Sequence, residues 1–249
     1  MLDPKKDNLD YGELLQSKAD YKFHSAIATS YSVDLNALLA VPIALCFNDT
    51  MDGDLKGEKL ALFEALDQMG QNLRVFYQEG KLSVPAQYNK LYALLEKYLV
   101  PIKPDINSSF HPKIWLVRYV KEKGRGKAIY KLLVLSKNLT FDRSWDVVLQ
   151  LDGNVKNQQP NDTFKSFNTF IRNLLNRDSK FEQGNKIRKD LNKIEWKAPE
   201  EFKELDIFVG GPKNGSPVKL FDYETEELMV VSPFIKSTGK KIEALNRLA

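Results

Sequence analysis

The stretch that decides the fold runs from Phe110 to Thr140 and reads FHPKIWLVRYVKEKGRGKAIYKLLVLSKNLT. Two runs rich in apolar and β-branched residues flank the turn-forming sequence KGRGK at residues 123–127. This pattern predicts a β-hairpin. Side chains alternate between the two faces of a strand, so His111 and Lys113 are expected on one face at the open end of the hairpin.

The register of the hairpin decides which polar side chains meet. If the strands pair symmetrically about residues 124–125, His111 lies opposite Asn138. Lys113 then lies opposite Ser136. Polar side chains at strand ends are ordinarily just solvated. Four of them together, an imidazole, an ammonium, a hydroxyl and an amide, form a set suited to binding an anion.

The composition is that of an ordinary globular protein. The chain has 249 residues, of which 43% are hydrophobic and 28% charged, and this length can bury a sizeable core. A net charge of +4 is compatible with a polyanionic partner, but the 33 acidic residues nearly balance the 37 basic ones, so composition alone does not favour nucleic acid. Residues 176–203 are highly charged and are interpreted as a solvated face rather than a phosphate-binding one.

Two further features bound the class of protein. With one cysteine and two histidines, a structural zinc site would need unusual ligands. No apolar run is long enough to cross a bilayer, and the first residues contain no signal-peptide core, so we expect a cytoplasmic protein with no membrane partner.

Hydrophobic patterns predict the elements around the hairpin. Strands are expected over Tyr21–Ser32, over Leu73–Phe76 and over Asp146–Leu151, the last pairing beside the hairpin. Helices are expected over Leu35–Ala40, with Asp34 as N-cap and Pro42 as an interruption, over Gln87–Val100 and over Phe164–Leu174, and residues 152–162 are expected to form a loop. His24 falls on the first strand, where a lone histidine is more often a packed or surface residue than a catalytic one.

The end of the chain looks like the start of a second copy of its first unit. A strand ending in Ser232-Pro-Phe234 leads into a helical pattern, as the strand ending in Thr29-Ser-Tyr31 does earlier. We therefore divide the chain into residues 1–203, which carry the hairpin, and residues 204–249, where a second repeat begins. Ala249 ends the helical pattern without a stop signal, so we expect this second repeat to be truncated.

The hairpin residues resemble the signature of the phospholipase D superfamily. In that family a His-x-Lys on one strand is followed by a return strand ending in Ser-x-Asn, often with Leu-Thr after it. Here the matching residues are His111-Pro-Lys113 and Ser136-Lys-Asn138-Leu-Thr140, and Asp146 stands about where many members place an acidic residue on the next strand. Many members have an aspartate five residues after the lysine, and the chain has Arg118 there, which looks more like the tyrosyl-DNA phosphodiesterase branch.

The resemblance implies an α/β fold, with a mixed sheet flanked by helices, and a phosphodiesterase reaction that needs no metal and no cofactor. His111 would attack the phosphodiester to give a phosphohistidine intermediate. Lys113 and Asn138 would hold the non-bridging oxygens, and Ser136 would complete that cradle. Asp146 would orient the imidazole of His111.

Only half of such a site is expected in this chain. In the family a second histidine and lysine, from the other repeat or from a partner subunit, protonate the leaving group, and His24 lacks the accompanying lysine. Either a homodimer or a missing C-terminal repeat would complete the site. The leading hypothesis is a hydrolase of the nuclease type that binds DNA or another phosphodiester, and the alternative is a non-catalytic nucleic-acid or phosphate-binding scaffold with the same fold. Phospholipid hydrolysis is disfavoured because no apolar interfacial segment is present.

Overall fold

Most of the residues that the structure describes lie in the first part of the chain. In the computed structural model the described residues are 11–46, 63, 66–67, 69–87, 89–106, 108–141, 146–156, 164–200, 202, 205, 207 and 209–210. The chain divides into two compact units, Met1–Asp206 and Ile207–Ala249, and the sheet, its helices and the site belong to the first. The predicted second repeat over residues 204–249 lies almost entirely outside the described residues.

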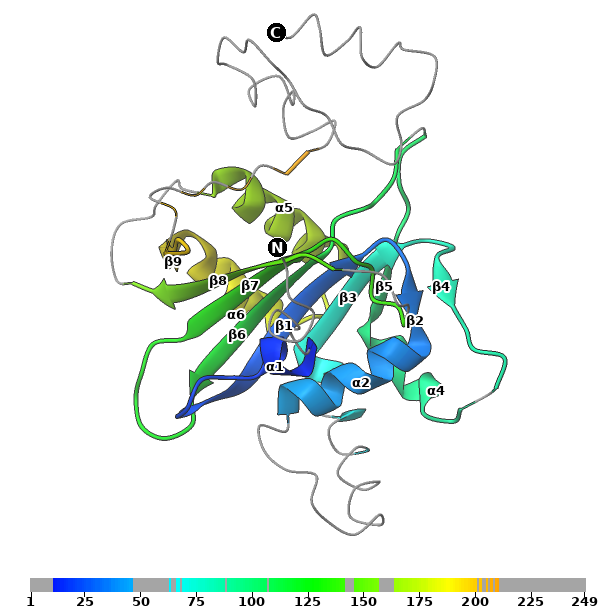
Figure 1. Cartoon of the computed structure of the whole chain (residues 1–249), viewed down its shortest axis with the longest axis horizontal. Coiled ribbons are helices and arrows are strands. Elements are labelled where there is room, and N and C mark those ends of the chain that lie inside the picture. Colours follow the sequence, from blue (N-terminus) through cyan, green and yellow to red (C-terminus); the bar gives the residue numbers. More distant parts are fainter. Residues whose placement is uncertain are drawn as a thin grey trace, which may run out of the picture. The chain divides into compact units, whose positions relative to one another are not determined.

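A seven-stranded mixed sheet forms the centre of the described part of the chain (Figure 1). Its strands are β1 (Tyr21–Ser30), β3 (Leu73–Gln78), β5 (Leu99–Ile102), β6 (Ile114–Lys121), β7 (Ile129–Leu135), β8 (Val148–Val155) and β9 (Ile194–Lys197). They lie in the order β5-β3-β1-β6-β7-β8-β9. Strands β5, β3 and β1 are parallel, and every pairing from β1–β6 to β8–β9 is antiparallel. The predicted mixed α/β class is confirmed.

Helices cover both faces of this sheet (Figure 1). On one side lie α1 (Tyr11–Leu15), α2 (Leu35–Cys46) and α4 (Tyr92–Leu95), and on the other lie α5 (Lys165–Arg177) and α6 (Gly184–Asp190). The 3-10 helices η1 (Glu96–Tyr98) and η2 (Leu191–Lys193) directly follow α4 and α6. Neighbouring residues of β6 show the two faces: the hydroxyl of Tyr119 donates to the carbonyl of Leu15 in α1, whereas Arg118 donates to Asp190 in α6. Within the described ranges, no helix combines the length and the apolar character needed to span a membrane.

Most of the predicted elements are present, and Asp34 is confirmed as an N-cap. Its Oδ1 accepts the backbone N–H of Asn36 at 2.7 Å and of Ala37 at 3.3 Å. The prediction that Pro42 interrupts the helix is wrong, because α2 continues through it to Cys46. Buried α2 residues such as Leu38 pack into the core around the sheet, and this burial outweighs the local cost of a proline.

Two other predicted boundaries, the end of a helix and the start of a loop, are wrong for the same reason. In both places the chain forms a strand that pairs with a distant part of the sequence. The helix predicted over Gln87–Val100 is reduced to α4 and η1, because Leu99–Ile102 becomes β5 and pairs with β3. The loop predicted over residues 152–162 begins later, because β8 continues to Val155 and pairs there with β9. A small two-stranded sheet of β2 (Val33–Asp34) and β4 (Leu82–Ser83) lies beside the main one.

The hairpin of β6 and β7 is present, but its predicted register is wrong by one residue. Ile114 pairs with Val134, so the pairing is centred on Gly124 alone rather than between residues 124 and 125. Gly124 has a φ of 82°, a conformation that glycine adopts without steric cost. As a result Lys113 lies opposite Leu135, whose N–H donates to the Lys113 carbonyl at 2.9 Å.

The corrected register removes the two predicted cross-strand pairs, Lys113 with Ser136 and His111 with Asn138. Strand β7 ends at Leu135, and the chain bends at the next residue. Contacts outside the hairpin ladder therefore set the positions of Ser136 and Asn138.

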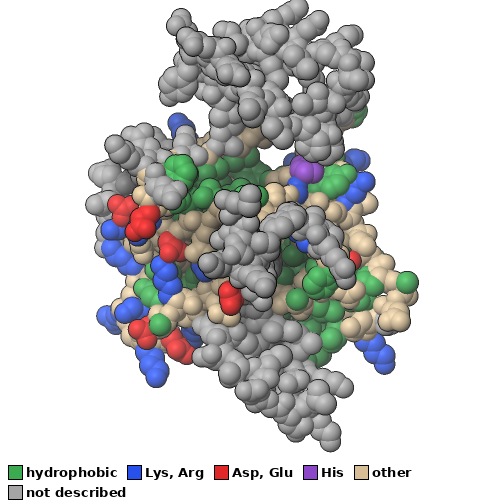
Figure 2. Space-filling view, in the orientation of Figure 1, with side chains coloured by type: hydrophobic (Ala, Val, Ile, Leu, Met, Phe, Trp, Pro, Cys, Tyr) green, Lys and Arg blue, Asp and Glu red, His purple; other side chains and the backbone are tan. Residues whose placement is uncertain are grey.

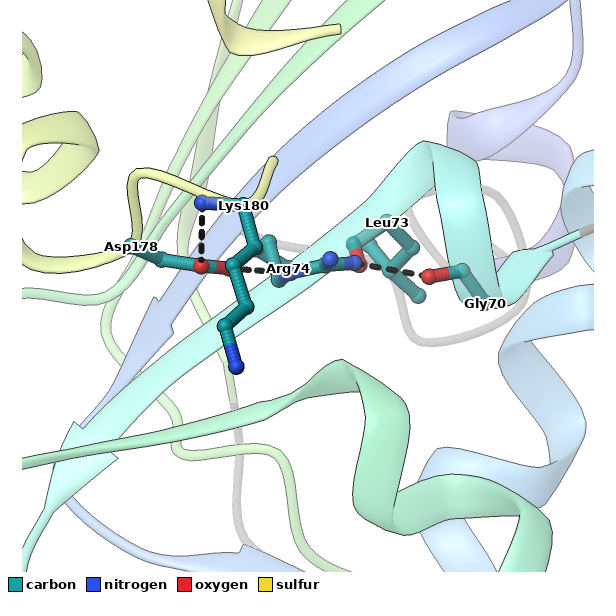
Figure 3. Close-up of polar contacts among 5 residues, drawn as sticks. All are labelled: Gly70, Leu73, Arg74, Asp178 and Lys180. Atoms are coloured by element: carbon teal, nitrogen blue, oxygen red, sulfur yellow. Dashed lines mark hydrogen bonds and ion pairs between the residues drawn. The ribbon is translucent and has the colours of Figure 1, made fainter. Parts of the chain in front are cut away.

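A buried ion pair ties β3 to the segment between α5 and α6 (Figure 3). Arg74 is 8% exposed, and its Nε donates to Asp178. Its Nη1 donates to the carbonyls of Gly70 at 2.8 Å and Leu73 at 2.7 Å, while the other oxygen of Asp178 accepts the backbone N–H of Lys180. This cation is therefore neutralised within the fold.

The charged surface is mixed in sign. On the face shown in Figure 2, Lys and Arg side chains are spread around the described surface, with Asp and Glu side chains among them. This distribution agrees with the near balance of acidic and basic residues in the sequence. The overall surface charge therefore does not mark a phosphate site, and only individual side chains could form one.

Candidate active site

The candidate site lies at the edge of the sheet where β6 begins. His111 and Lys113 immediately precede β6, and Tyr31 and Gln78 lie at the carboxyl ends of β1 and β3. Because β1 and β3 are parallel and β6 runs antiparallel to β1, these chain ends meet at the same edge. Side chains from three segments that are distant in the sequence therefore converge there.

Lys113 and His111 form the centre of the site. The ammonium Nζ of Lys113 lies 2.7 Å from Nδ1 and 3.3 Å from Nε2 of the imidazole, and it donates to the His111 carbonyl at 3.2 Å. Lys113 is only 8% exposed, whereas His111 is exposed. Among the described residues, no carboxylate lies within ion-pair distance of this ammonium.

The protonation of this pair follows from its surroundings. The residue as a whole is exposed, but partial burial of its imidazole lowers the pKa of His111, and the neighbouring charge of Lys113 lowers that pKa further. Burial also lowers the pKa of Lys113, against a smaller opposite effect from the carboxylate of Asp146. The pKa of His111 thus lies below the ordinary histidine value of 6.5, so the imidazole is neutral at neutral pH, and its one unprotonated nitrogen accepts a hydrogen bond from Lys113.

Thr29 of β1 fixes the backbone on both sides of Lys113. Its hydroxyl donates to the carbonyl of Pro112 at 2.9 Å and accepts the N–H of Ile114 at 3.1 Å. Thr29 is 3% exposed, and its hydrogen bond with Ile114 is buried while the one to Pro112 is partly buried. Lys113 therefore extends from a rigid segment of chain.

Asn138 is held by the end of β1, with its amide oriented. Its Oδ1 accepts the backbone N–H of Tyr31 at 3.2 Å and lies 3.4 Å from the hydroxyl oxygen of Ser30, which donates its own proton to the Ser32 carbonyl at 2.6 Å. Since the oxygen is occupied, the amino group Nδ2 is the end of the amide left to donate to another group. An amide donor oriented in this way suits an anionic oxygen.

Tyr31 connects the His111–Lys113 pair to Asn138. Its ring centroid lies 4.9 Å from that of His111, with 39° between the ring planes. Its N–H binds Asn138, and its carbonyl accepts the N–H of Gln78 at 3.3 Å. The side-chain oxygen of Gln78 in turn accepts the N–H of Phe110 at 2.9 Å. The chain around His111 is therefore tied to both parallel strands.

Ser136 and Asp146 have a different place from the predicted one. Oδ1 of Asp146 accepts the hydroxyl of Ser136 at 2.6 Å and the N–H groups of Ser136 and Lys137 at 2.9 Å, and the Ser136 hydroxyl accepts the N–H of Val147. These contacts hold the chain after β7 to the start of β8. The imidazole of His111 instead contacts Lys113 and Tyr31, so the orienting role predicted for Asp146 does not follow from its contacts.

Three residues that hold the site together escaped the sequence analysis: Thr29, Tyr31 and Gln78. All lie at the carboxyl ends of strands, and the run Thr29-Ser-Tyr31 is visible in the sequence as a polar end to an apolar strand. In sheets with parallel strands, binding sites commonly lie at that edge. This signal could have drawn attention to the run as part of a site.

His24, the other histidine, lies elsewhere. Its Nδ1 is 2.9 Å from the Ser25 hydroxyl, and its Nε2 is 3.3 Å from the ammonium of Lys186 in α6. Burial, and after it the charge of Arg118, lowers the pKa of His24 to about 4. These contacts are those of a half-buried residue packed against the α6 side of the sheet.

Comparisons with known proteins found one weak resemblance, to solved structures. No protein-family model matches the chain, and no curated protein matches it. The chain is similar to solved structures of yeast tyrosyl-DNA phosphodiesterase: one is 14% identical with a TM-score of 0.42 and 70% of this chain covered, and a mutant of it is 16% identical with a TM-score of 0.43 and the same coverage. The chain spans about a third of the length of these proteins, 35% and 36% respectively.

A likeness at this identity and TM-score carries no argument about the site.

Proposed function

We propose that this protein is a phosphodiesterase that acts on nucleic acid through His111. The observation that carries the proposal is the pairing of an exposed, neutral imidazole with the ammonium of Lys113, which is 8% exposed and has no carboxylate in ion-pair contact among the described residues. A buried cation without a counter-charge is costly for the free protein. A phosphate group supplies that counter-charge, and the neutral imidazole beside it is a nucleophile.

In the proposed reaction a ring nitrogen of His111 forms a bond to phosphorus, and the bond from phosphorus to the leaving oxygen breaks with its electron pair on that oxygen. Lys113 exchanges its contact with the imidazole for a non-bridging phosphate oxygen, and Nδ2 of Asn138 donates to another. These donors stabilise the charge that develops in the transition state. Water then attacks the phosphohistidine, which frees His111 and releases a phosphate monoester.

Asp146 and Ser136 have a supporting role in this proposal. Their hydrogen bonds fix the chain between β7 and β8, and Asn138 lies on that chain. Since the Ser136 hydroxyl already donates to Asp146 and accepts from Val147, we assign the phosphate contacts to Lys113 and Asn138 alone.

The proton for the leaving oxygen has to come from a general acid outside the His111–Lys113 pair. The sequence contains two histidines and no second His-x-Lys. We propose that a second copy of the chain or a further repeat supplies this acid, so that the chain carries half of a complete site.

Hydrolysis of bis-p-nitrophenyl phosphate in EDTA tests the proposed function. The protein is expected to turn over this substrate, and His111→Asn is expected to reduce the rate to background. The matched control is His24→Asn, which alters the other histidine and should leave the rate unchanged. Equal activity in the wild type and in His111→Asn would overturn the assignment.

A non-catalytic phosphate-binding scaffold is the second candidate, favoured by the lack of a second His-x-Lys. In that case a single-stranded oligonucleotide should bind without being cleaved. Binding should weaken in Lys113→Met and persist in His111→Asn. Cleavage by the wild type would exclude this candidate.

A further inference from the structure

A second lysine lies against the tyrosine that contacts the candidate nucleophile. The ammonium of Lys81 is 5.4 Å from the ring centroid of Tyr31, and the imidazole centroid of His111 is 4.9 Å from the same point. The separation between this ammonium and the imidazole is at most the sum of these two distances, about 10 Å. Lys81 therefore belongs to the surroundings of the site.

The backbone of Lys81 is held in place while its side chain is exposed. Its N–H donates to the Gln78 carbonyl at 3.0 Å, which closes a turn with Gly80 at a φ of 76°. Glycine tolerates this positive φ, whereas other residues are strained by it. The Lys81 carbonyl accepts the N–H of Val33 at 3.0 Å, so the turn is also tied to the segment that follows Tyr31.

Lys81 forms no ion pair with another described residue. The ion pairs between described residues involve Lys18, Arg74, Lys97, Arg118 and Lys156 as their cations. The Lys81 ammonium lies near an aromatic ring instead, in a cation–π arrangement worth about 0.5–1 kcal/mol at an exposed site. Such a weak contact leaves the ammonium free to bind an anion.

We propose that Lys81 forms a second phosphate subsite, which binds the phosphate next to the scissile one in a single nucleic-acid strand. This inference rests on the proposed function and names its substrate class as a polynucleotide rather than an isolated diester. Successive phosphates of one strand are about 3.4 Å apart along a helix axis, and farther apart in an extended strand. The Lys81 ammonium lies at most about 10 Å from the His111 imidazole. It can therefore reach a phosphate next to the one that His111 attacks.

Two substrates separate this subsite from the catalytic pair. Bis-p-nitrophenyl phosphate has one phosphate and uses only the His111 site, whereas a ten-residue thymidine oligonucleotide also offers flanking phosphates. In EDTA, Lys81→Met is expected to lower the ratio of oligonucleotide to single-diester kcat/KM about tenfold, and to make the slope of log kcat/KM against log salt shallower by about 0.7. Lys81→Arg keeps the charge and should recover most of the ratio.

The matched control is Lys123→Met, which removes the same charge from the exposed tip of the β6–β7 hairpin. It should leave the ratio of the two kcat/KM values unchanged. An unchanged ratio in Lys81→Met, or an equal fall in Lys123→Met, would overturn the subsite.

Failure of the proposed function gives a different result. If the wild type hydrolyses neither substrate, the proposed phosphodiesterase activity is refuted. The Kd of the oligonucleotide then tests the Lys81 subsite directly. Lys81→Met should weaken that binding about tenfold relative to Lys123→Met. Equal Kd values for the two variants would overturn the subsite as well.

Discussion

Arg74 and Lys113 are equally buried cations, each 8% exposed, in very different surroundings. Arg74 binds the carboxylate of Asp178 and two backbone carbonyls, so its charge is used within the fold. Lys113 contacts a neutral imidazole and one carbonyl, both from His111. The first cation holds segments of the chain together, whereas we propose that the second binds an anion from outside.

Lys131 shows that burial without an ion pair does not define a site by itself. It is also 8% exposed, and burial lowers its pKa. Its ammonium donates to the carbonyls of Leu14 at 2.8 Å and Gln16 at 2.9 Å, which join α1 to the sheet. Lys113 differs because its ammonium lies beside an exposed imidazole.

The largest expected effect concerns the structural cation. Arg74→Met leaves the carboxylate of Asp178 without its partner, and the loss of one member of a buried pair typically costs about 3–5 kcal/mol of unfolding free energy. Urea denaturation measures this loss, and kcat/KM per folded molecule should stay unchanged. Lys180→Met, an exposed neighbour, should alter stability by less than about 0.5 kcal/mol. A loss in Arg74→Met as small as that of the control would contradict the structural role.

The opposite pattern is expected for Lys113→Met. Removing a donor that stabilises transition-state charge typically lowers the rate about 10²–10³-fold, while removal of a buried charge without a counter-charge should leave stability within about 1 kcal/mol. Lys131→Met is the control, because it should lower stability by leaving two carbonyls unpaired and leave kcat/KM of the folded enzyme unchanged. Equal losses of activity in both variants would remove the distinction between them.

A smaller loss is expected for Asn138→Asp. The carboxylate keeps an oxygen that can accept the N–H of Tyr31, but it replaces the amino group with a second, negatively charged oxygen. Loss of one charge-assisted hydrogen bond of about 1.5–3 kcal/mol corresponds to about a tenfold to hundredfold fall in kcat/KM. Asn192→Asp is the control, since Oδ1 of Asn192 also accepts hydrogen bonds, from Asn168 and Arg172. If Asn138→Asp keeps full activity, Nδ2 does not contact the phosphate.

The smallest expected effect is a shift in the titration of His111. Burial and Lys113 together lower its pKa, so the imidazole should stay neutral as the pH falls through 6.5 and gain its proton only at lower pH. Lys113→Met removes the second cause, and the pKa should then rise toward 6.5 while burial keeps it below that value. NMR titration can follow both histidines, with His24 remaining at about 4 in both proteins. A His111 pKa above 6.5, or one unchanged in Lys113→Met, would contradict the account.

The parts of the fold that depend on local pattern were predictable. The hairpin follows from alternating residues around a glycine-rich turn, and the contact between His111 and Lys113 joins residues two positions apart. The register was not predictable, because it depends on whether the turn is centred on one residue or two. A slip of one residue changes every cross-strand pair, and in the folded hairpin the pairing is centred on Gly124.

The rest of the site depends on contacts between distant parts of the chain. The amide of Asn138 is oriented by Tyr31, 107 residues earlier, and the backbone beside Lys113 is fixed by Thr29 across 85 residues. Asp146 looked like a partner for His111 from its position in the sequence, yet it binds the turn ten residues before it. Such contacts follow from the strand order of the sheet, which a motif does not contain.

The most direct test of the central claim is a search for the phosphohistidine itself. The protein is mixed rapidly with excess bis-p-nitrophenyl phosphate, denatured at alkaline pH, where phosphohistidine persists, and analysed by intact and peptide mass spectrometry. The account predicts a nitrophenyl-phosphoryl adduct on the peptide that contains His111, absent from His111→Asn and present in His24→Asn. Turnover by the wild type with no adduct, or an adduct on a different residue, would contradict it.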